Sequence, residues 1–247
     1  MGLLIHIEMY KLRTVRAPLI LLALSQLIIV GGVSGLAMSA GDLHDPTLAA
    51  EALAHAGLVS LLTLVLGITA VAGEYRNKTI TDTYLSTPRR GRAVQAKLVA
   101  YGIAGSFFAV CNAVTAVVTA RIWWAVNDVP FHVTSPGVWH TLVGCAVWNV
   151  AFAVIGVGIG ALVRNLTAAV AGALAWIALV EGIIGQLIGG GLARWLPFAS
   201  GSALGDMTVA GSTVHPLSQI GGGMVLAAYA AVFALIAVTT TVRRDVT

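Results

Sequence analysis

The sequence has few charged residues and few cysteines. Only 10% of its 247 residues are charged, whereas soluble domains ordinarily carry about 25%. This shortage excludes a soluble globular protein. The two cysteines, Cys111 and Cys145, both fall inside apolar runs. This excludes a disulfide framework and a cysteine-based zinc site.

Long apolar runs dominate the chain instead. A bilayer core about 30 Å thick needs roughly 20 apolar residues per helix. The sequence therefore predicts an all-α integral membrane protein with six transmembrane helices in one domain, 1–247. The predicted spans are approximately residues 17–40, 52–73, 98–126, 138–163, 166–188 and 220–242. In the fourth span, Gly156, Gly158 and Gly160 would let a neighbouring helix approach closely.

Two further segments are moderately apolar but are not predicted to span: the first is too short and the second is too polar. Residues 1–16 alternate apolar with polar positions at roughly helical spacing, which predicts an amphipathic helix lying on the membrane surface. A plain basic flank is the alternative. Residues 189–218 form either an ordinary outer loop or a re-entrant hairpin between the fifth and sixth spans, which would need protein or water around it.

Basic residues gather on one side of the predicted membrane. The stretch Gly73–Lys97 is the only long charged run, with six basic residues against two acidic ones. In the six-span topology, twelve of the fourteen basic residues lie on the same side of the membrane as this stretch. Only Arg121 and Arg194 lie on the other side. Since cytoplasmic loops carry the excess of Lys and Arg, we expect a multi-pass protein of the cell membrane with both termini in the cytoplasm.

The sequence lacks the motifs of nucleotide-binding, catalytic, metal-binding and nucleic-acid-binding sites. The run Gly73–Thr79 lacks the second glycine of a phosphate-binding loop and follows a membrane helix where a strand is required. No His-Glu-x-x-His sequence occurs, and the six histidines do not share metal-ligand spacing. The basic residues have no aromatic interleaving of the kind that nucleic-acid binding uses. We therefore expect no enzyme, no nucleotide-binding domain, no metal and no nucleic-acid partner.

Four groups of residues carry a resemblance to a known family. They are a Glu-x-Arg-x-x-Thr opening (Glu74 to Thr79), a Leu-x-x-Pro turn (Leu85 to Pro88), the basic run Glu8–Arg16 and the segment Leu196–Phe198. With the six-span plan, they resemble bacterial permeases of the type-2 (exporter) family of ATP-binding-cassette transporters. The chain departs from that family at Lys78, where members commonly have glycine.

The resemblance implies a transmembrane subunit of an ATP-driven exporter that works by alternating access. Two copies of a separate ATPase chain would bind ATP and magnesium, a second permease subunit, identical or similar, would complete the pathway, and this chain would bind no cofactor. The residues of the ATPase-coupling loop would be Glu74, Tyr75, Arg76, Lys78, Thr79, Tyr84, Leu85, Pro88, Arg89, Arg90, Arg92 and Lys97. The alternatives are a loop that serves only as a topology anchor, and a membrane sensor or immunity module of the same fold that does not transport.

Two acidic residues are singled out. Glu181 is the only acid well inside a predicted span, and a carboxylate facing lipid would cost several kcal/mol. It therefore either lines the pathway, with Gln186 as a second candidate, or is satisfied by a neighbouring helix. Glu74 stands where the second span leaves the membrane, and we expect it to pair with one of the nearby cations Arg76, Lys78, Arg89, Arg90 and Arg92.

Overall fold

A computed structural model of the chain describes residues 1–87, 89–183, 190–207 and 216–243. Within these ranges the regular elements are all helices. In chain order they are α1 (Gly2–Thr14), α2 (Arg16–Ser39), α3 (Pro46–Leu58), α4 (Ser60–Arg76), α5 (Ile80–Ser86), α6 (Arg90–Val126), α7 (Pro136–Val163), α8 (Leu166–Ala175), the π-helix η1 (Trp176–Glu181), α10 (Gly190–Ala193), α11 (Pro197–Leu204) and α12 (Gln219–Arg243).

Five helical stretches are long and apolar enough to cross a membrane. They are Arg16–Ser39, Thr47–Arg76, Arg90–Val126, Pro136–Val163 and Gln219–Thr240. The predicted fifth span corresponds to the shorter apolar helix Leu166–Glu181, and residues 184–188 of that span lie outside the described residues. The predicted all-helical fold is thus confirmed and is compatible with a membrane protein, and the count of six spans stays a prediction.

Two helices begin earlier than the sequence predicted. The helix of the second span begins at Pro46 because Asp45 caps it, accepting a hydrogen bond from the Thr47 amide at 2.9 Å, and because proline suits the first helical position. This helix is interrupted at Val59, between α3 and α4. The helix of the third span begins at Arg90 instead of residue 98, so much of the charged stretch is helical.

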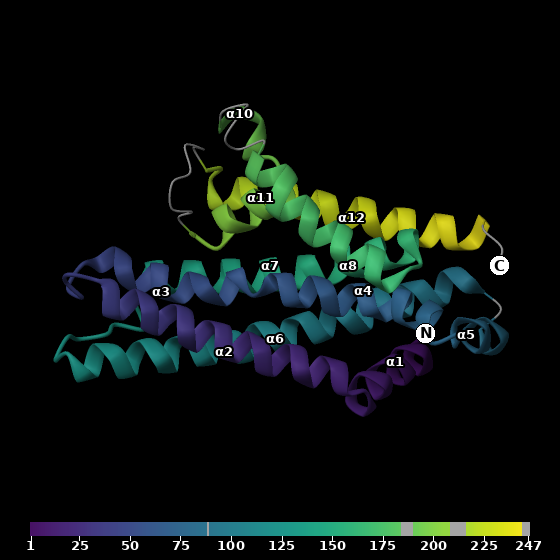
Figure 1. The fold of residues 1–247 in the computed structure, drawn as a ribbon, viewed down its shortest axis with the longest axis horizontal. Coiled ribbons are helices and arrows are strands. Elements are labelled where there is room, and N and C mark those ends of the chain that lie inside the picture. Colours follow the sequence, from purple (N-terminus) through teal and green to yellow (C-terminus); the bar gives the residue numbers. More distant parts are fainter. Residues whose placement is uncertain (88, 184–189, 208–215, 244–247) are drawn as a thin grey trace.

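Helix α7 lies at the centre of the molecule. It packs against α4, α6 and α12, and Figure 1 shows α3, α4 and α7 between α2 and α6 on one side and α12 on the other. The predicted close approach at its glycines is confirmed, because Gly156 and Gly160 face backbone of α4 and Gly158 faces Phe233 of α12. A side chain at these positions would overlap the neighbouring helix.

A buried polar network joins α2, α6 and α7. The Asn112 side-chain oxygen accepts hydrogen bonds from Ser25 Oγ at 3.0 Å and from Gln26 Nε2 at 2.8 Å. Its Nδ2 donates to Asn149 Oδ1 at 3.3 Å, and the Asn149 amide donates to the Ala56 carbonyl at 2.9 Å. Since these buried polar atoms satisfy one another, the network fixes the relative position of the three helices within the apolar bundle.

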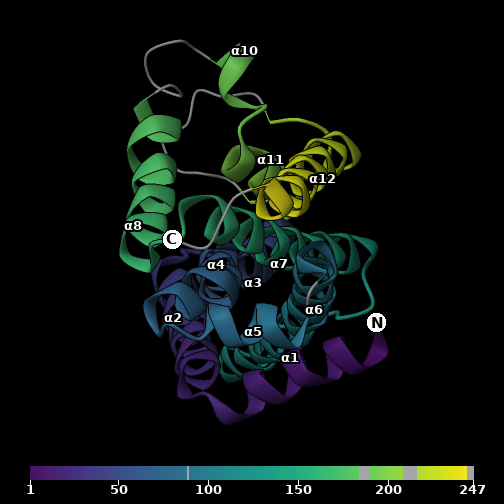
Figure 2. The same ribbon diagram turned by 90° about the vertical axis from the view of Figure 1, so that its right-hand side faces the viewer.

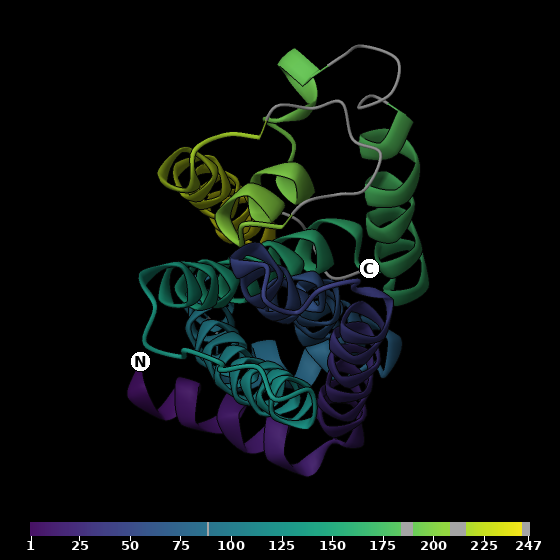
Figure 3. The ribbon, with the colours of Figure 1, turned by 90° about the vertical axis from the view of Figure 1, so that its left-hand side faces the viewer.

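The two ends of the bundle carry different elements. Helices α1 and α5 and the last turn of α12 lie at one end of the long axis (Figure 1), which we call the α5 end. Viewed along that axis, α1 lies across the direction of the long helices (Figure 2). That α1 lies on the membrane surface stays a prediction. Toward the other end, α11 lies beside α12 (Figure 3). Helix α8 begins near the α5 end, just after α7, and runs obliquely away from the long helices (Figure 1).

Candidate functional site

Four charged side chains meet at the α5 end. Glu8 lies on α1, Glu74 in the last turns of α4 and Lys97 in the first turns of α6, and these three residues are buried. Lys97 is 2% exposed, which is unusual for a lysine. Lys11 on α1 completes the set with a side chain that is 38% exposed. We call these four residues the charge cluster.

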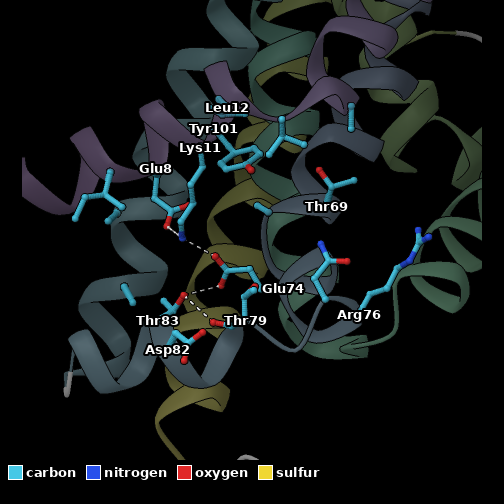
Figure 4. A pocket seen from close by; sticks show the side chains of 18 of the residues that line it. Glu8, Lys11, Leu12, Thr69, Glu74, Arg76, Thr79, Asp82, Thr83 and Tyr101 are labelled. Carbon is cyan, nitrogen blue, oxygen red and sulfur yellow. Dashed lines mark hydrogen bonds and ion pairs between the residues drawn. The ribbon is translucent and has the colours of Figure 1, made fainter.

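Each ammonium group of the charge cluster contacts both carboxylates. Lys97 Nζ donates to Glu74 Oε1 at 2.7 Å and to Glu8 Oε2 at 2.9 Å. Lys11 Nζ donates to Glu74 Oε1 at 2.7 Å and to Glu8 Oε1 at 2.8 Å. Figure 4 shows Glu8, Lys11 and Glu74 converging between α1 and α4. Because three helices supply the four groups, the cluster ties α1, α4 and α6 together.

The charges of the cluster balance. Two carboxylates and two ammonium groups leave no net charge, which is the condition under which buried ions are tolerated. For Lys11, burial by itself lowers the pKa, but the hydrogen bonds and charges of Glu74 and Glu8 outweigh it, so its pKa is raised above the ordinary lysine value. Lys11 therefore stays charged at neutral pH.

Helix α5 is attached to the charge cluster through its inner face. Thr83 Oγ1 donates to Glu74 Oε2 at 3.3 Å, and Ile80 is 3% exposed. The Arg90 guanidinium stacks 5.3 Å from the centre of the Tyr84 ring. Leu85, on the other face, is 76% exposed. The charged stretch thus contains a short helix, α5, with one face held against the bundle and an apolar residue on the exposed face.

The turn from α4 into α5 has the geometry of a glycine-type helix end. The Lys78 amide donates to the Tyr75 carbonyl at 3.2 Å and the Thr79 amide to the Glu74 carbonyl at 3.0 Å, which is the Schellman pattern. Its left-handed position is occupied by Lys78, with φ of 59°. The resemblance expected glycine at this residue, and the backbone explains why glycine would suit it.

A cavity of about 730 Å³ adjoins the charge cluster. One part of its lining is apolar and comes mainly from α1 and the start of α2, including Leu4, Ile7, Leu12, Val15 and Pro18. Its polar lining comes mainly from α4, α5 and the turn between them and includes Glu74, Arg76, Thr79 and Asp82. Its volume falls in the range of about 300–1,000 Å³ typical of small-molecule sites.

The remaining members of the predicted coupling loop are spread around the α5 end. Tyr75 packs under the Arg164 guanidinium, 5.4 Å from the ring centre. Pro88 lies outside the described residues. The other members not yet placed are exposed and form a basic rim: Arg89 and Arg92, with Arg76 and Lys78 nearer the turn.

The prediction that Glu74 pairs with a cation nearby in the sequence was wrong. Its carboxylate pairs with Lys97 and Lys11, and none of the five cations nearest in sequence forms the expected pair. Those five residues follow Glu74 at the surface, whereas Lys97 is turned inward because α6 begins seven residues before it, at Arg90. Sequence reasoning also missed Glu8 and Lys11. Their spacing of three residues places both on one face of α1, but nothing in the sequence shows that this face meets α4.

Glu181 lies away from the charge cluster, at the end of η1, and caps α11. Its carboxylate accepts hydrogen bonds from the Phe198 amide at 3.0 and 3.1 Å and from the Ala199 amide at 3.2 Å. Pro197 precedes them at the first helical position. Glu181 closes a π-helix, a geometry frequent at functional sites. Gln186, its predicted companion, lies outside the described residues.

In the parts of the chain that the structure describes, no group of three or more His, Cys, Asp or Glu side chains could hold a metal ion. The charge cluster instead has a structural role, because its ion pairs hold α1, α4 and α6 together and its bond to Thr83 holds one face of α5. No known protein-family model matches this chain, and no curated protein matches it significantly.

Proposed function

We propose that this chain is the transmembrane subunit of an ATP-driven exporter and that α5 receives the movement of a separate ATPase subunit. The observation that carries the proposal is the attachment of α5. Its inner face is bonded to a buried charge cluster that joins α1, α4 and α6, while Leu85 stands exposed beside a basic rim. An exposed leucine among cations suits a protein partner with an apolar pocket and acidic surroundings.

The same contacts would transmit a displacement of α5 to the membrane-length helices. A displacement of α5 acts on Glu74 through Thr83 and through the α4 turn. Glu74 passes it to α1 through Lys11 and to α6 through Lys97. Because the Asn112 network joins α6 to α2 and α7, these helices respond as one body, and the pathway opens and closes where they meet a second, identical or similar, subunit.

The proposed topology extends the helical bundle to six spans. Leu166–Glu181 begins the fifth span, and α11 belongs to a re-entrant outer segment held by Glu181. The α5 end then faces the cytoplasm of a bacterial cell, in accord with its basic residues, and brings α1 and the end of α12 to that side. In this arrangement Glu181 anchors the outer segment beside the pathway.

Co-purification tests the proposed partner. The tagged chain, extracted from native membranes in mild detergent, is expected to retain a stoichiometric ATPase chain with a phosphate-binding loop. Leu85→Asp should remove that chain, because it places a charge in the contact. Val126→Asp is the matched control, since Val126 is 71% exposed at the other end of the molecule, and it should retain the ATPase. Absence of any ATPase from the wild-type preparation would reject the proposal.

A second measurement tests coupling as distinct from binding. In liposomes that contain the complex, Glu74→Ala should lower the substrate moved per ATP hydrolysed, whereas His44→Ala, an exposed change near the opposite end, should not. Wild-type transport and assembly in both Glu74→Ala and Arg76→Ala/Tyr84→Ala would show that the segment only anchors topology. ATP hydrolysis without transport of any candidate substrate would favour a sensor module.

A further inference from the structure

The cavity beside the charge cluster has an apolar wall and an exposed carboxylate, Asp82, that the proposed ATPase contact does not use. Its apolar lining comes from α1, the helix that lies across the bundle (Figure 2), and from the start of α2. Its polar lining holds both a cation and an anion beyond the balanced cluster. We propose that this cavity binds one zwitterionic phospholipid with a primary ammonium headgroup, of the phosphatidylethanolamine type.

The position and walls of the cavity suit an amphiphile. Helix α1 lies across the end of the membrane-length helices (Figure 2), at the level where lipid headgroups meet a helix of this orientation. Leu4, Ile7 and Leu12 supply apolar contacts for the start of an acyl chain. Figure 4 shows Leu12 on one side of the cavity and Thr79, Asp82 and Arg76 on the other, with Asp82 and Arg76 at its two edges, and a headgroup would lie between these two. A free headgroup would leave the apolar wall unused.

The charges select the headgroup. Within the charge cluster the two lysines and two glutamates neutralise one another. Arg76 and Asp82 also line the cavity and are exposed, and neither has an ion-pair partner in the described parts of the chain. One unpaired cation with one unpaired anion matches a ligand that carries both signs. An anionic lipid would meet the Asp82 carboxylate, and a cationic amphiphile would meet Arg76.

Hydrogen bonding distinguishes between zwitterionic headgroups. The planar guanidinium of Arg76 can donate two parallel hydrogen bonds to a phosphate. A primary ammonium donates up to three hydrogen bonds, and Asp82 with the Thr79 hydroxyl offers acceptors for them. A quaternary choline has no N–H to donate. The cavity should therefore prefer an ethanolamine headgroup over choline.

This inference goes beyond the proposed exporter function and does not rest on it. The cavity lies on the inner side of α5, toward α1, whereas the proposed ATPase contact at Leu85 is on the opposite face. Arg76 belongs to both sites, whereas Asp82 lines the cavity and is not part of the proposed ATPase contact. Asp82→Asn therefore tests lipid binding separately, and Leu85→Asp tests ATPase binding separately.

Native mass spectrometry of the purified chain tests the inference directly. The protein is incubated with equal amounts of phosphatidylethanolamine, phosphatidylcholine and phosphatidylglycerol of identical acyl chains. We expect one phosphatidylethanolamine molecule per chain to be retained about tenfold over the other two lipids, the effect of losing one hydrogen bond to a charged group. Arg76→Gln and Asp82→Asn should each lower that retention by about tenfold.

Matched controls and a soluble competitor complete the experiment. Arg121→Gln and Asp128→Asn change an exposed cation and an exposed anion of α6 and its following turn, and they should leave retention unchanged. Glycerophosphoethanolamine, which has the headgroup without acyl chains, should not displace the lipid at equal concentration. Preference for phosphatidylglycerol, equal retention in all four variants, or displacement by the soluble headgroup would each overturn the assignment.

Discussion

Lys97 and Glu74 are 23 residues apart in the sequence, and their side chains form a buried ion pair with 2.7 Å between Nζ and Oε1. The lysine comes from α6 and the glutamate from α4, on either side of α5. The pair therefore closes the segment that carries the proposed coupling helix into a loop with fixed ends. Any rearrangement of α5 must either keep this pair or break it at considerable cost.

Removing one member of the charge cluster should destabilise the protein strongly. Lys97→Met leaves two buried carboxylates with only Lys11, and breaking a buried pair in this way typically costs about 3–5 kcal/mol. The free energy of unfolding, measured by detergent denaturation, should fall by that order. Lys97→Met/Glu74→Gln restores charge balance between Glu8 and Lys11, so it should recover much of the loss. Additive losses in the double variant would contradict a shared cluster.

Replacing Lys78 with glycine should stabilise the turn between α4 and α5. A side chain in the left-handed region costs about 1 kcal/mol or more, and glycine avoids that cost. Lys78→Gly should therefore raise the unfolding free energy by roughly that amount. Lys78→Ala removes the same charge but keeps Cβ, so it should give no such gain. Equal gains in both variants would trace the effect to charge instead of backbone strain.

Much of the helical fold could be predicted from the sequence, because a long apolar run with basic flanks indicates a membrane-length helix whatever it packs against. Helix α3 starts at Pro46, earlier than predicted, because Asp45 caps it. Hydropathy, which set the predicted start, takes no account of capping. The charge cluster could not be foreseen. Glu8 meets Lys97 across 89 residues, and the sequence does not reveal which face of α1 packs on the bundle. The role of Glu181 likewise depended on where α11 turns back.

The contact between α4 and α7 should tolerate no side chain at Gly67. A Cβ there would overlap the Ala153 carbonyl and lie 2.9 Å from the Val157 amide nitrogen. Gly67→Ala should destabilise by about 1–3 kcal/mol, the usual cost of overpacking. Gly172→Ala, on α8 with nothing within 4 Å of its Cβ, should instead stabilise by about 0.4–1 kcal/mol. Thermal unfolding in detergent distinguishes the two, and similar shifts would refute the close packing.

Glu181 should protect the first turn of α11. Glu181→Ala leaves the Phe198 and Ala199 amides without their acceptor, at a cost of about 0.5–2 kcal/mol for a lost helix cap. Hydrogen–deuterium exchange should accelerate in α11 and remain unchanged in α6. Glu181→Gln, which keeps one acceptor oxygen, should fall between wild type and Glu181→Ala. Asp206→Asn, an exposed change after α11, serves as the control, and unaltered exchange in Glu181→Ala would exclude the capping role.

The charge cluster also imposes an order on biosynthesis. Glu8 and Lys11 leave the ribosome first, Glu74 follows, and Lys97 comes last. Until Lys97 is made, the nascent chain holds two carboxylates and one ammonium group at this site, so burying them would leave a negative charge without a partner. Helix α1 therefore stays on the hydrated membrane surface until α6 has emerged and docks only then. A ribosome stalled shortly before residue 97 would hold α1 accessible to protease, and one stalled after α6 would not.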